Sequence, residues 1–454
     1  MKIGRVAVAG LVGLMLAIAA GPAAAVQPPE VVAGPPPPDD PPGPEFPTKQ
    51  NMACLATGVL PDSDLSQVPP PDLALDLAAA RALSRGSGVT VAVVDTGVQP
   101  NPRLPTVVGG GDYVTAGGDG LSDCDAHGTL VAGIIGASPD PADAFGGVAP
   151  EARIISIRYR SGAFRSEFPT NSGQGQGQEL ALEVRNMARA IVRAANLGAG
   201  VITVSLPICV PVDAPVDHAM LAAAVGYATQ VRGALIVAGA GNAGTSGCTQ
   251  NPGVNPGNPA DERNWSGVKT ISTPGWYSPT VLTVGFSTAT GTPMPDSLTG
   301  PWVSVSAPGT GIESLGPGGT GLINGVGEPG KLVPVAGASF AAAYVSGVAA
   351  LLRSRFPNET PAEIIARLQA AAHEPARGID NAVGAGMIDP MAALSYRTPP
   401  KPPAGLFQAG PLQMPDPPRA DDARPAVTAT VVVLVAVLLG AAATYAGNAT
   451  RRRR

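Results

Sequence analysis

Three short segments of the sequence each place a polar side chain beside glycine and an apolar stretch. They read V-A-V-V-D-T-G-V at 91–98, H-G-T-L-V-A-G-I-I at 127–135 and G-A-S-F-A-A-A-Y-V-S-G at 337–347. A serine becomes a nucleophile when a base takes its proton, and histidine can be that base near neutral pH. A buried carboxylate fixes the tautomer of the histidine and stabilises its charged form. The segments therefore predict acyl transfer by Asp95, His127 and Ser339.

Each segment has another interpretation when it is taken alone. D-T-G also occurs in aspartic proteases, but their chemistry needs two carboxylates in one site, and no second D-T-G or D-S-G is present. His127 could be structural, and Ser339 could be a small residue at a helix start. The glycines at 239, 241 and 244 fit a dinucleotide fingerprint, but the loop-like sequence at 245–259 follows where a helix is required. The combination favours the serine chemistry.

The order Asp, His, Ser and the three segments resemble the subtilase family of serine proteases. A fourth segment, A-G-A-G-N-A-G at 238–244, is similar to the family's oxyanion-hole segment and implies Asn242 as a donor. The resemblance covers about 72–394 and implies protein or peptide substrates, no cofactor and no assignable metal site. The substrate-binding residues that it implies are Ser205, Leu206, Ala238, Gly239 and Ala240.

The sequence departs from the usual family pattern beside these residues. Ala338, Phe340 and Ala343 stand where Thr, Met and Pro are common, and none of these changes removes a catalytic group. Pro207 stands where relatives often have glycine, next to the strand that resembles the family's substrate-pairing edge. The usual shape of that edge is therefore in doubt.

The elements that must position these side chains alternate between apolar runs and helical spacing. Strands that alternate with helices imply an α/β fold with a parallel sheet covered on both faces. Ligands bind beyond the carboxyl ends of such strands, and Asp95 lies at such an end. The expected strands are 89–94, 154–157, 201–205, 234–238, 281–285 and 302–306. The expected helices are 179–197, 216–231, 339–353 and 361–372.

The two ends of the chain predict export and a membrane anchor. Lys2 and Arg5 precede an apolar run at 6–20 and a small-residue cleavage site at 23–25, which indicates a signal peptide at 1–25. A retained anchor is the alternative for this segment. The uncharged run at 426–446 is long enough to span a bilayer, and the arginines at 451–454 would stay on the cytoplasmic side. The catalytic domain is therefore expected on the extracellular or periplasmic side.

Composition agrees with one globular domain between extended ends. The 454 residues include 50 Pro, many of them near the termini, and the net charge of −5 gives no case for nucleic-acid binding. The predicted organisation is a signal peptide at 1–25, a Pro-rich extension packed on the catalytic domain at 26–71, a peptidase domain at 72–397, a linker at 398–425, a transmembrane helix at 426–446 and a basic tail at 447–454.

Four cysteines in an exported chain favour two disulfides over a metal site, because no two of them are close in sequence. Of the three possible pairings we expect Cys54–Cys124 and Cys209–Cys248. Cys209 follows one predicted strand and Cys248 lies past the next, so both fall at the same edge of a parallel sheet. Cys54 is then left for Cys124, three residues before His127. This bond would keep the extension attached to the mature domain.

The whole arrangement resembles the mycosins, the subtilases associated with type VII secretion systems. The shared features are a signal peptide, a Pro-rich extension with a cysteine, the H-G-T-L-V-A-G segment, a Pro-rich stalk and a C-terminal span with a basic tail. The resemblance implies a membrane protease that processes exported proteins beside a type VII secretion complex. The alternative is a structural subunit of that complex in which proteolysis is secondary.

Overall fold

The computed structural model describes residues 26–167, 175–245, 247–319, 321–376, 378–396 and 424–451. The chain divides into two units, Met1–Pro402 and Pro403–Arg454. The predicted signal peptide and most of the predicted linker lie outside the described residues.

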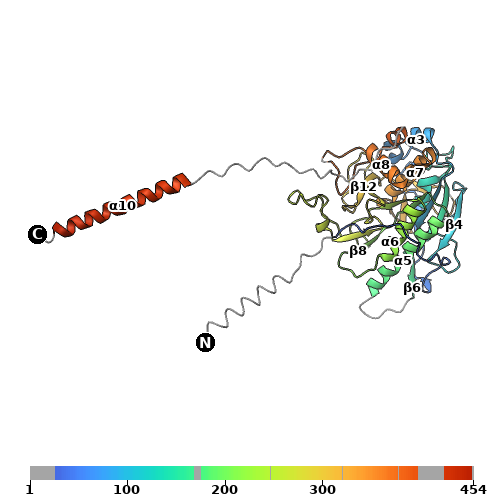
Figure 1. Ribbon diagram of the computed structural model, residues 1–454. Coiled ribbons are helices and arrows are strands. Elements are labelled where there is room, and N and C mark those ends of the chain that lie inside the picture. The colour runs from blue at the N-terminus through green and yellow to red at the C-terminus, as the bar shows by residue number, and fades with distance from the viewer. Residues whose placement is uncertain are drawn as a thin grey trace, which may run out of the picture. The chain divides into compact units, whose positions relative to one another are not determined.

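A seven-stranded sheet forms the centre of the first unit (Figure 1). Its order is β12-β11-β9-β7-β3-β5-β4, and all neighbouring strands are parallel. This arrangement confirms the predicted α/β fold with a parallel sheet. The strands are β3 (Thr90–Asp95), β4 (Val107–Asp112), β5 (Arg153–Arg158), β7 (Val201–Val204), β9 (Leu235–Gly239), β11 (Leu282–Ser287) and β12 (Val303–Pro308).

Helices cover both faces of this sheet, which is why its strands have continuous apolar sequences. In β3, Val91 and Val93 belong to the core under α4, α7 and α8, whereas Ala92 and Val94 belong to the core under α5 and α6. In Figure 1, α7 and α8 lie in the upper part of this unit and α5 and α6 lie below them. The helices are α4 (His127–Gly136), α5 (Gly175–Asn196), α6 (Ala219–Gly226), α7 (Ala338–Arg355) and α8 (Pro361–Ala371).

Helix α7 runs through the centre of the unit, as its apolar sequence predicts. Every residue at 338–352 is buried. Helix α8 begins as predicted, with Pro361 at its first position and a capping box between Thr360 and Glu363. The predicted helix at 216–231 is shorter than expected: α6 begins at 219, and a π-helical turn (Tyr227–Val231) follows it.

All six predicted strands overlap observed ones, and strand β4 was not predicted. Its sequence V-V-G-G-G-D contains three consecutive glycines, which have low strand propensity. It lies at the edge of the sheet, where β5 is its one partner among the described strands. The pairing itself, and not local preference, therefore makes this segment a strand.

The N-terminal extension is part of the folded unit. Strand β1 (Thr48–Gln50) pairs with β6 (Phe164–Ser166), and β2 (Ala56–Gly58) pairs with β15 (Gly325–Glu328), which also pairs with β16 (Lys331–Pro334). Between them, Cys54 is bonded to Cys124, and the second disulfide joins Cys209 to Cys248. Both bonds match the predicted pairs. The remaining elements are α2 (Pro70–Ala74), α3 (Leu77–Leu83), β8 (Ile208–Pro211), η2 (Trp265–Gly267), β10 (Thr270–Thr273), β13 (Ser314–Leu315), β14 (Leu322–Ile323) and α9 (Pro390–Ser395).

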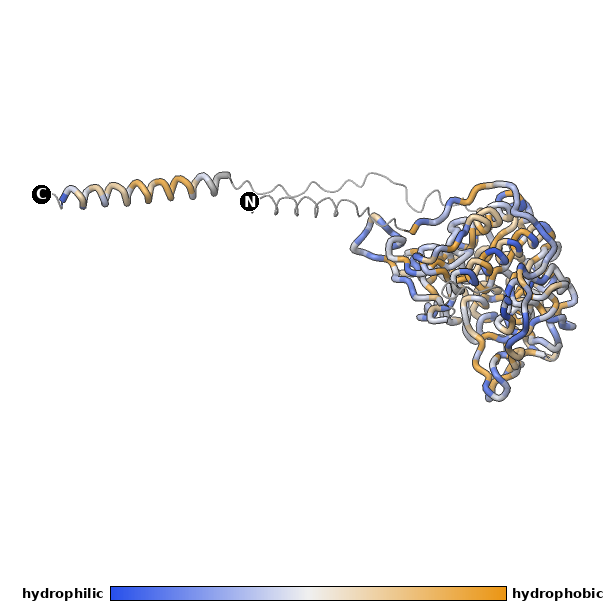
Figure 2. The backbone as a smooth tube through the Cα atoms, turned by 90° about the horizontal axis from the view of Figure 1, so that it is seen from below, coloured by the Kyte–Doolittle hydropathy of each residue, from blue (hydrophilic) through white to orange (hydrophobic). Residues whose placement is uncertain are grey.

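The described part of the second unit is a single helix, α10 (Arg424–Arg451). The segment Thr428–Arg451 contains an 18-residue stretch with a mean hydropathy of 2.2, and none of that stretch is buried against protein. In Figure 2, which colours the backbone by residue hydropathy, much of this helix is orange, the colour of hydrophobic residues. The predicted segment at 426–446 lies inside this helix, which is long and apolar enough to cross a bilayer.

Replacing Cys54 and Cys124 together by alanine should lower the free energy of unfolding. The bond closes a segment of 70 residues, for which chain entropy predicts a loss of roughly 4 kcal/mol. Denaturant unfolding without reductant measures it. The matched control removes Cys209 and Cys248, which close 39 residues, and should cost a similar amount. Unchanged stability in the first variant alone would show that the extension is not held by its disulfide.

Candidate active site

Asp95 ends strand β3 and is fully buried at the carboxyl edge of the sheet. Its Oδ1 accepts hydrogen bonds from His127 Nδ1 at 2.8 Å and from the Thr96 N–H at 2.6 Å. The Ser205 hydroxyl donates to Oδ2. Burial alone would raise the pKa of Asp95, but the His127 charge and these donors hold the pKa below its ordinary value. Asp95 is therefore a carboxylate at neutral pH.

His127 is the first residue of α4, so the helix start fixes where its ring lies. Burial alone would lower the pKa of His127. The charge and hydrogen bond of Asp95, with smaller contributions from Asp123 and Asp125, raise the pKa above its ordinary value. The side chain remains 20 % exposed, so the ring can meet a substrate. This arrangement suits a general base whose charged form is stabilised from one side.

Ser339 is the second residue of α7, and 4 % of its surface is exposed. The positive end of the helix dipole lies at this position. Gly337 precedes the helix with φ +146°, and a Cβ there would lie 2.8 Å from Asn242 Nδ2. Asn242 Oδ1 accepts a hydrogen bond from the Ala338 N–H at 3.0 Å. The amide of Asn242 is thereby fixed beside the start of the helix that carries Ser339.

The starts of α4 and α7 face each other. The ring centroid of Phe340 lies 5.2 Å from that of His127. Among the hydrogen bonds of the described residues, none joins Ser339 to His127. The bond between a catalytic serine and its base is often long in a free enzyme and tightens with substrate. The fold thus brings the three predicted catalytic residues to one place, and their roles remain predictions.

A cleft of about 370 Å³ opens beside His127. Asn242 and Phe340 line it from the catalytic domain, together with Leu206 and Arg160. The sequence did not predict its opposite rim, which comes from Leu55 of the extension and from the hairpin β15–β16. The predicted bond between Cys54 and Cys124 was the one signal that pointed there, because it placed the extension beside the base. The hairpin residues on this rim are Val326, Pro334, Val335 and Ala336.

The predicted substrate-binding residues fall into two groups. Leu206 lines the cleft, and Pro207 lies beside it. The Ser205 hydroxyl donates to Asp95 instead of facing the cleft, so its side chain supports the carboxylate. Residues 238–240 are buried at the end of β9 and beyond it, and they are not among the residues that line the cleft. A substrate contact by their backbone stays a prediction.

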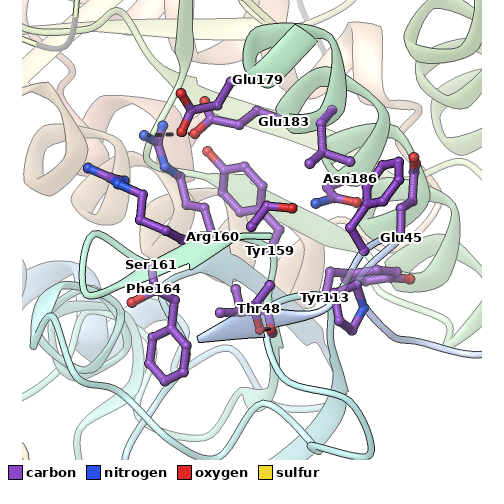
Figure 3. Close-up of a pocket in the computed structure, with 16 residues that line it drawn as sticks. Glu45, Thr48, Tyr113, Tyr159, Arg160, Ser161, Phe164, Glu179, Glu183 and Asn186 are labelled. Carbon is purple, nitrogen blue, oxygen red and sulfur yellow. Dashed lines mark hydrogen bonds and ion pairs between the residues drawn. The ribbon is translucent and has the colours of Figure 1, made fainter. Parts of the chain in front are cut away.

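A second, smaller pocket of about 70 Å³ lies between the extension and α5 (Figure 3). Arg160 lines both this pocket and the cleft, and its guanidinium forms an ion pair with Glu183 at 3.4 Å. Tyr159 lines the pocket and donates its hydroxyl proton to the Leu206 carbonyl on the cleft wall. The extension, α5 and one wall of the cleft are therefore in continuous contact.

The described residues offer no group of three or more His, Cys, Asp or Glu side chains placed to hold a metal ion. All four cysteines are in disulfides.

Residues 86–386 match the subtilase family of peptidases. Mycosin-1 of Mycobacterium tuberculosis is 46% identical over 398 residues, which are 87% of this chain and 88% of that relative. The chain belongs to the mycosin group of subtilases. This mycosin is therefore a serine protease by family, as its sequence predicts.

Solved structures give the same result for the fold. MycP1 from Mycobacterium smegmatis is 45% identical with a TM-score of 0.79, and the match covers 86% of this chain and all of that one. A chain in the structure of an intact ESX-5 inner membrane complex is 46% identical with a TM-score of 0.80, covering 94% of this mycosin and 100% of that chain. These matches confirm the predicted α/β fold and identify it as the subtilisin-like fold of the subtilase family.

Activity of this mycosin should fall on the acid side with a midpoint above the ordinary histidine pKa of 6.5. The base must be neutral, so activity is present above the raised pKa of His127 and lost as the pH falls through it. The profile of kcat/KM against pH measures this midpoint. Asp95→Asn should move it downward, because the charge that raises the pKa is gone, and should lower kcat by about 10⁴-fold. A wild-type midpoint below 6.5 would contradict the assignment of His127 as the base.

Proposed function

We propose that this mycosin is a membrane-anchored endopeptidase in which Asp95, His127 and Ser339 hydrolyse peptide bonds through an acyl-enzyme. One observation carries the proposal. The hydrogen bond of 2.8 Å between His127 Nδ1 and the buried Asp95 lies at a cleft whose wall includes the start of α7, where Ser339 is located. This is the relation that a base needs with its orienting carboxylate and its nucleophile.

In the acylation step, His127 Nε2 takes the proton of the Ser339 hydroxyl as its oxygen attacks the peptide carbonyl. Asp95 accepts a hydrogen bond from Nδ1 and stabilises the imidazolium that forms. The imidazolium then gives its proton to the leaving amine, and the C–N bond breaks. A water molecule, deprotonated by His127, then attacks the ester. The imidazolium returns this proton to the Ser339 oxygen as the ester C–O bond breaks and the second product leaves.

Two donors meet the negative oxygen of the tetrahedral intermediate. One is the backbone N–H of Ser339, which points out of the first turn of α7 and has no partner within the helix. The other is Asn242 Nδ2, whose orientation is fixed by the 3.0 Å hydrogen bond between its own Oδ1 and the Ala338 N–H. Donors that are held in place before the reaction stabilise the developing charge without rearranging.

The place of action follows from α10 and from the relatives. A helix of this length and hydropathy can span a bilayer, and the arginines at 451–454 favour its end on the cytoplasmic side. The catalytic domain then lies on the extracellular or periplasmic side. Relatives of the same group are part of an intact ESX-5 inner membrane complex and of its periplasmic assembly. We place this mycosin at a type VII secretion complex, where it would process exported proteins.

A structural role in that complex is the second candidate. The same relatives within ESX-5 assemblies favour it, and so do apolar side chains that remain exposed on the extension. Met52 is 54 % exposed, Leu55 41 % and Val59 50 %. These three apolar side chains fall within residues 52–59 and are available for contact with another protein. The two functions predict different results for a chain that folds but cannot cleave.

Ser339→Ala should abolish proteolysis and labelling by a fluorophosphonate without lowering stability, because Ser339 is the nucleophile. Asn242→Ala should still be labelled, but more slowly, and its kcat should fall by about 10²–10³-fold. Labelling that persists in Ser339→Ala would refute the assignment. Comparison of the exported proteins of wild type, Ser339→Ala and a deletion strain separates the functions. If Ser339→Ala loses processing but keeps export, the protease function is supported. If export is lost in the deletion strain and not in Ser339→Ala, the structural role is supported.

A chain that ends at Tyr396 should be soluble and active, because it keeps the catalytic unit and lacks the apolar helix. Fractionation of cells that express it, beside cells with the full chain, measures the partition. Full-length protein should appear in the membrane fraction and the shortened one in the soluble exported fraction. If the shortened chain stays with the membrane, α10 is not the only anchor.

A further inference from the structure

Asp123 is a buried carboxylate that the proposed reaction does not use. It lies in the loop before α4 and is 7 % exposed. Its Oδ1 accepts from the Thr96 hydroxyl at 2.9 Å and from the Asp125 N–H at 3.1 Å. Its Oδ2 accepts from Thr129 twice, from the N–H at 2.9 Å and from the hydroxyl at 2.6 Å. Four donors thus surround one carboxylate.

These donors come from the two segments that carry the base and its partner. Thr96 follows Asp95 at the end of β3, and Thr129 lies in the first turn of α4, two residues after His127. A further hydrogen bond of 3.0 Å runs from the Gly128 N–H to the Thr96 hydroxyl oxygen. The end of β3 and the start of α4 are therefore joined by hydrogen bonds that run through the Thr96 hydroxyl and the Asp123 carboxylate.

We infer that Asp123 is a positioning residue that holds His127 in register with Asp95. The inference rests on the proposed function and deepens it. The His127–Asp95 hydrogen bond joins segments that are 32 residues apart in sequence. By accepting hydrogen bonds from Thr96 and Thr129, the Asp123 carboxylate holds the segment of Asp95 and the segment of His127 in place without touching the substrate.

The charge of Asp123 has a second effect, which a neutral hydrogen-bond acceptor could not supply. Burial, with the charge of Asp95, raises the pKa of Asp123 to about 6, so it is ionised at neutral pH. It then adds to the acidic groups that raise the pKa of His127, which are Asp95, Asp123 itself and Asp125. Among the described residues that line the same cleft, Arg160 carries a positive charge.

Asp123→Asn tests the inference, because the amide keeps the shape of the side chain. It replaces the charged carboxylate, to which Thr129 donates two hydrogen bonds, with a neutral group. We expect kcat per active site to fall by about 10–100-fold with KM within about twofold, since misplacement by an ångström costs rate and not binding. The acid limb of kcat/KM should move to lower pH, because one anion near His127 is lost. Fluorophosphonate titration counts active sites, so a partly unfolded sample does not imitate the effect.

Thr129 offers matched variants that do not bury a new polar group. Thr129→Val removes one donor to Asp123 and should lower kcat, whereas Thr129→Ser keeps the hydroxyl and should restore it. The double variant Asp123→Asn with Thr129→Val should lose less than the product of the two single losses, because both break one link. Asp64→Asn removes an exposed acid and should leave kcat and the acid limb unchanged.

The inference is overturned if Asp123→Asn and Thr129→Val both keep the wild-type kcat per labelled site and leave the acid limb of kcat/KM where it is. Lower thermal stability with these kinetic values unchanged would show that Asp123 only supports the fold. Failure of the proposed function looks different. In that case the wild-type chain itself is not labelled at Ser339, whatever the residue at 123.

Discussion

The hydrogen bond between the buried Asp95 and His127 is the contact on which the rest of the site depends. An unpaired carboxylate inside a protein costs several kcal/mol, so the fold must surround Asp95 with donors. It does so with groups from separate elements: the Thr96 N–H after β3, the Ser205 hydroxyl after β7 and the ring of His127 at the start of α4. Because β7 lies directly beside β3 in the sheet, Ser205 can reach Asp95 and stabilise its charge.

Close backbone approach is the second constraint, and it explains glycines next to the chemical residues. A Cβ on Gly128 would lie 2.0 Å from the Gly97 oxygen, so α4 can begin against the D-T-G loop only with glycine after His127. At Gly337 a side chain would meet the amide of Asn242. Each glycine lets a helix start reach the position where its neighbour, His127 or Ser339, can act.

The sequence predicted what is encoded locally or by strand direction. Continuous apolar runs identified the central strands because both sheet faces are buried, and the end of one run located Asp95. Strand β4 could not be found this way, because its glycines have no preference for strands. It becomes a strand through its pairing with β5. The roles of Ser205 and Asp123 were missed for a similar reason. Each role depends on a hydrogen bond between residues far apart in sequence. Ser205 and its partner Asp95 are 110 residues apart, and Asp123 and its partner Thr96 are 27 apart.

The rim of the cleft was the least predictable part, and it changes how the extension should be understood. Leu55 reaches the cleft because Cys54 is bonded to Cys124 and because the Leu55 N–H donates to the Cys124 carbonyl at 2.9 Å. Cys124 lies between Asp123 and Asp125, so the extension is fixed to the same loop that holds the base. A propeptide that leaves after one cut needs no such bond. The covalent link therefore makes the extension a wall of the substrate cleft as well as a support for the domain.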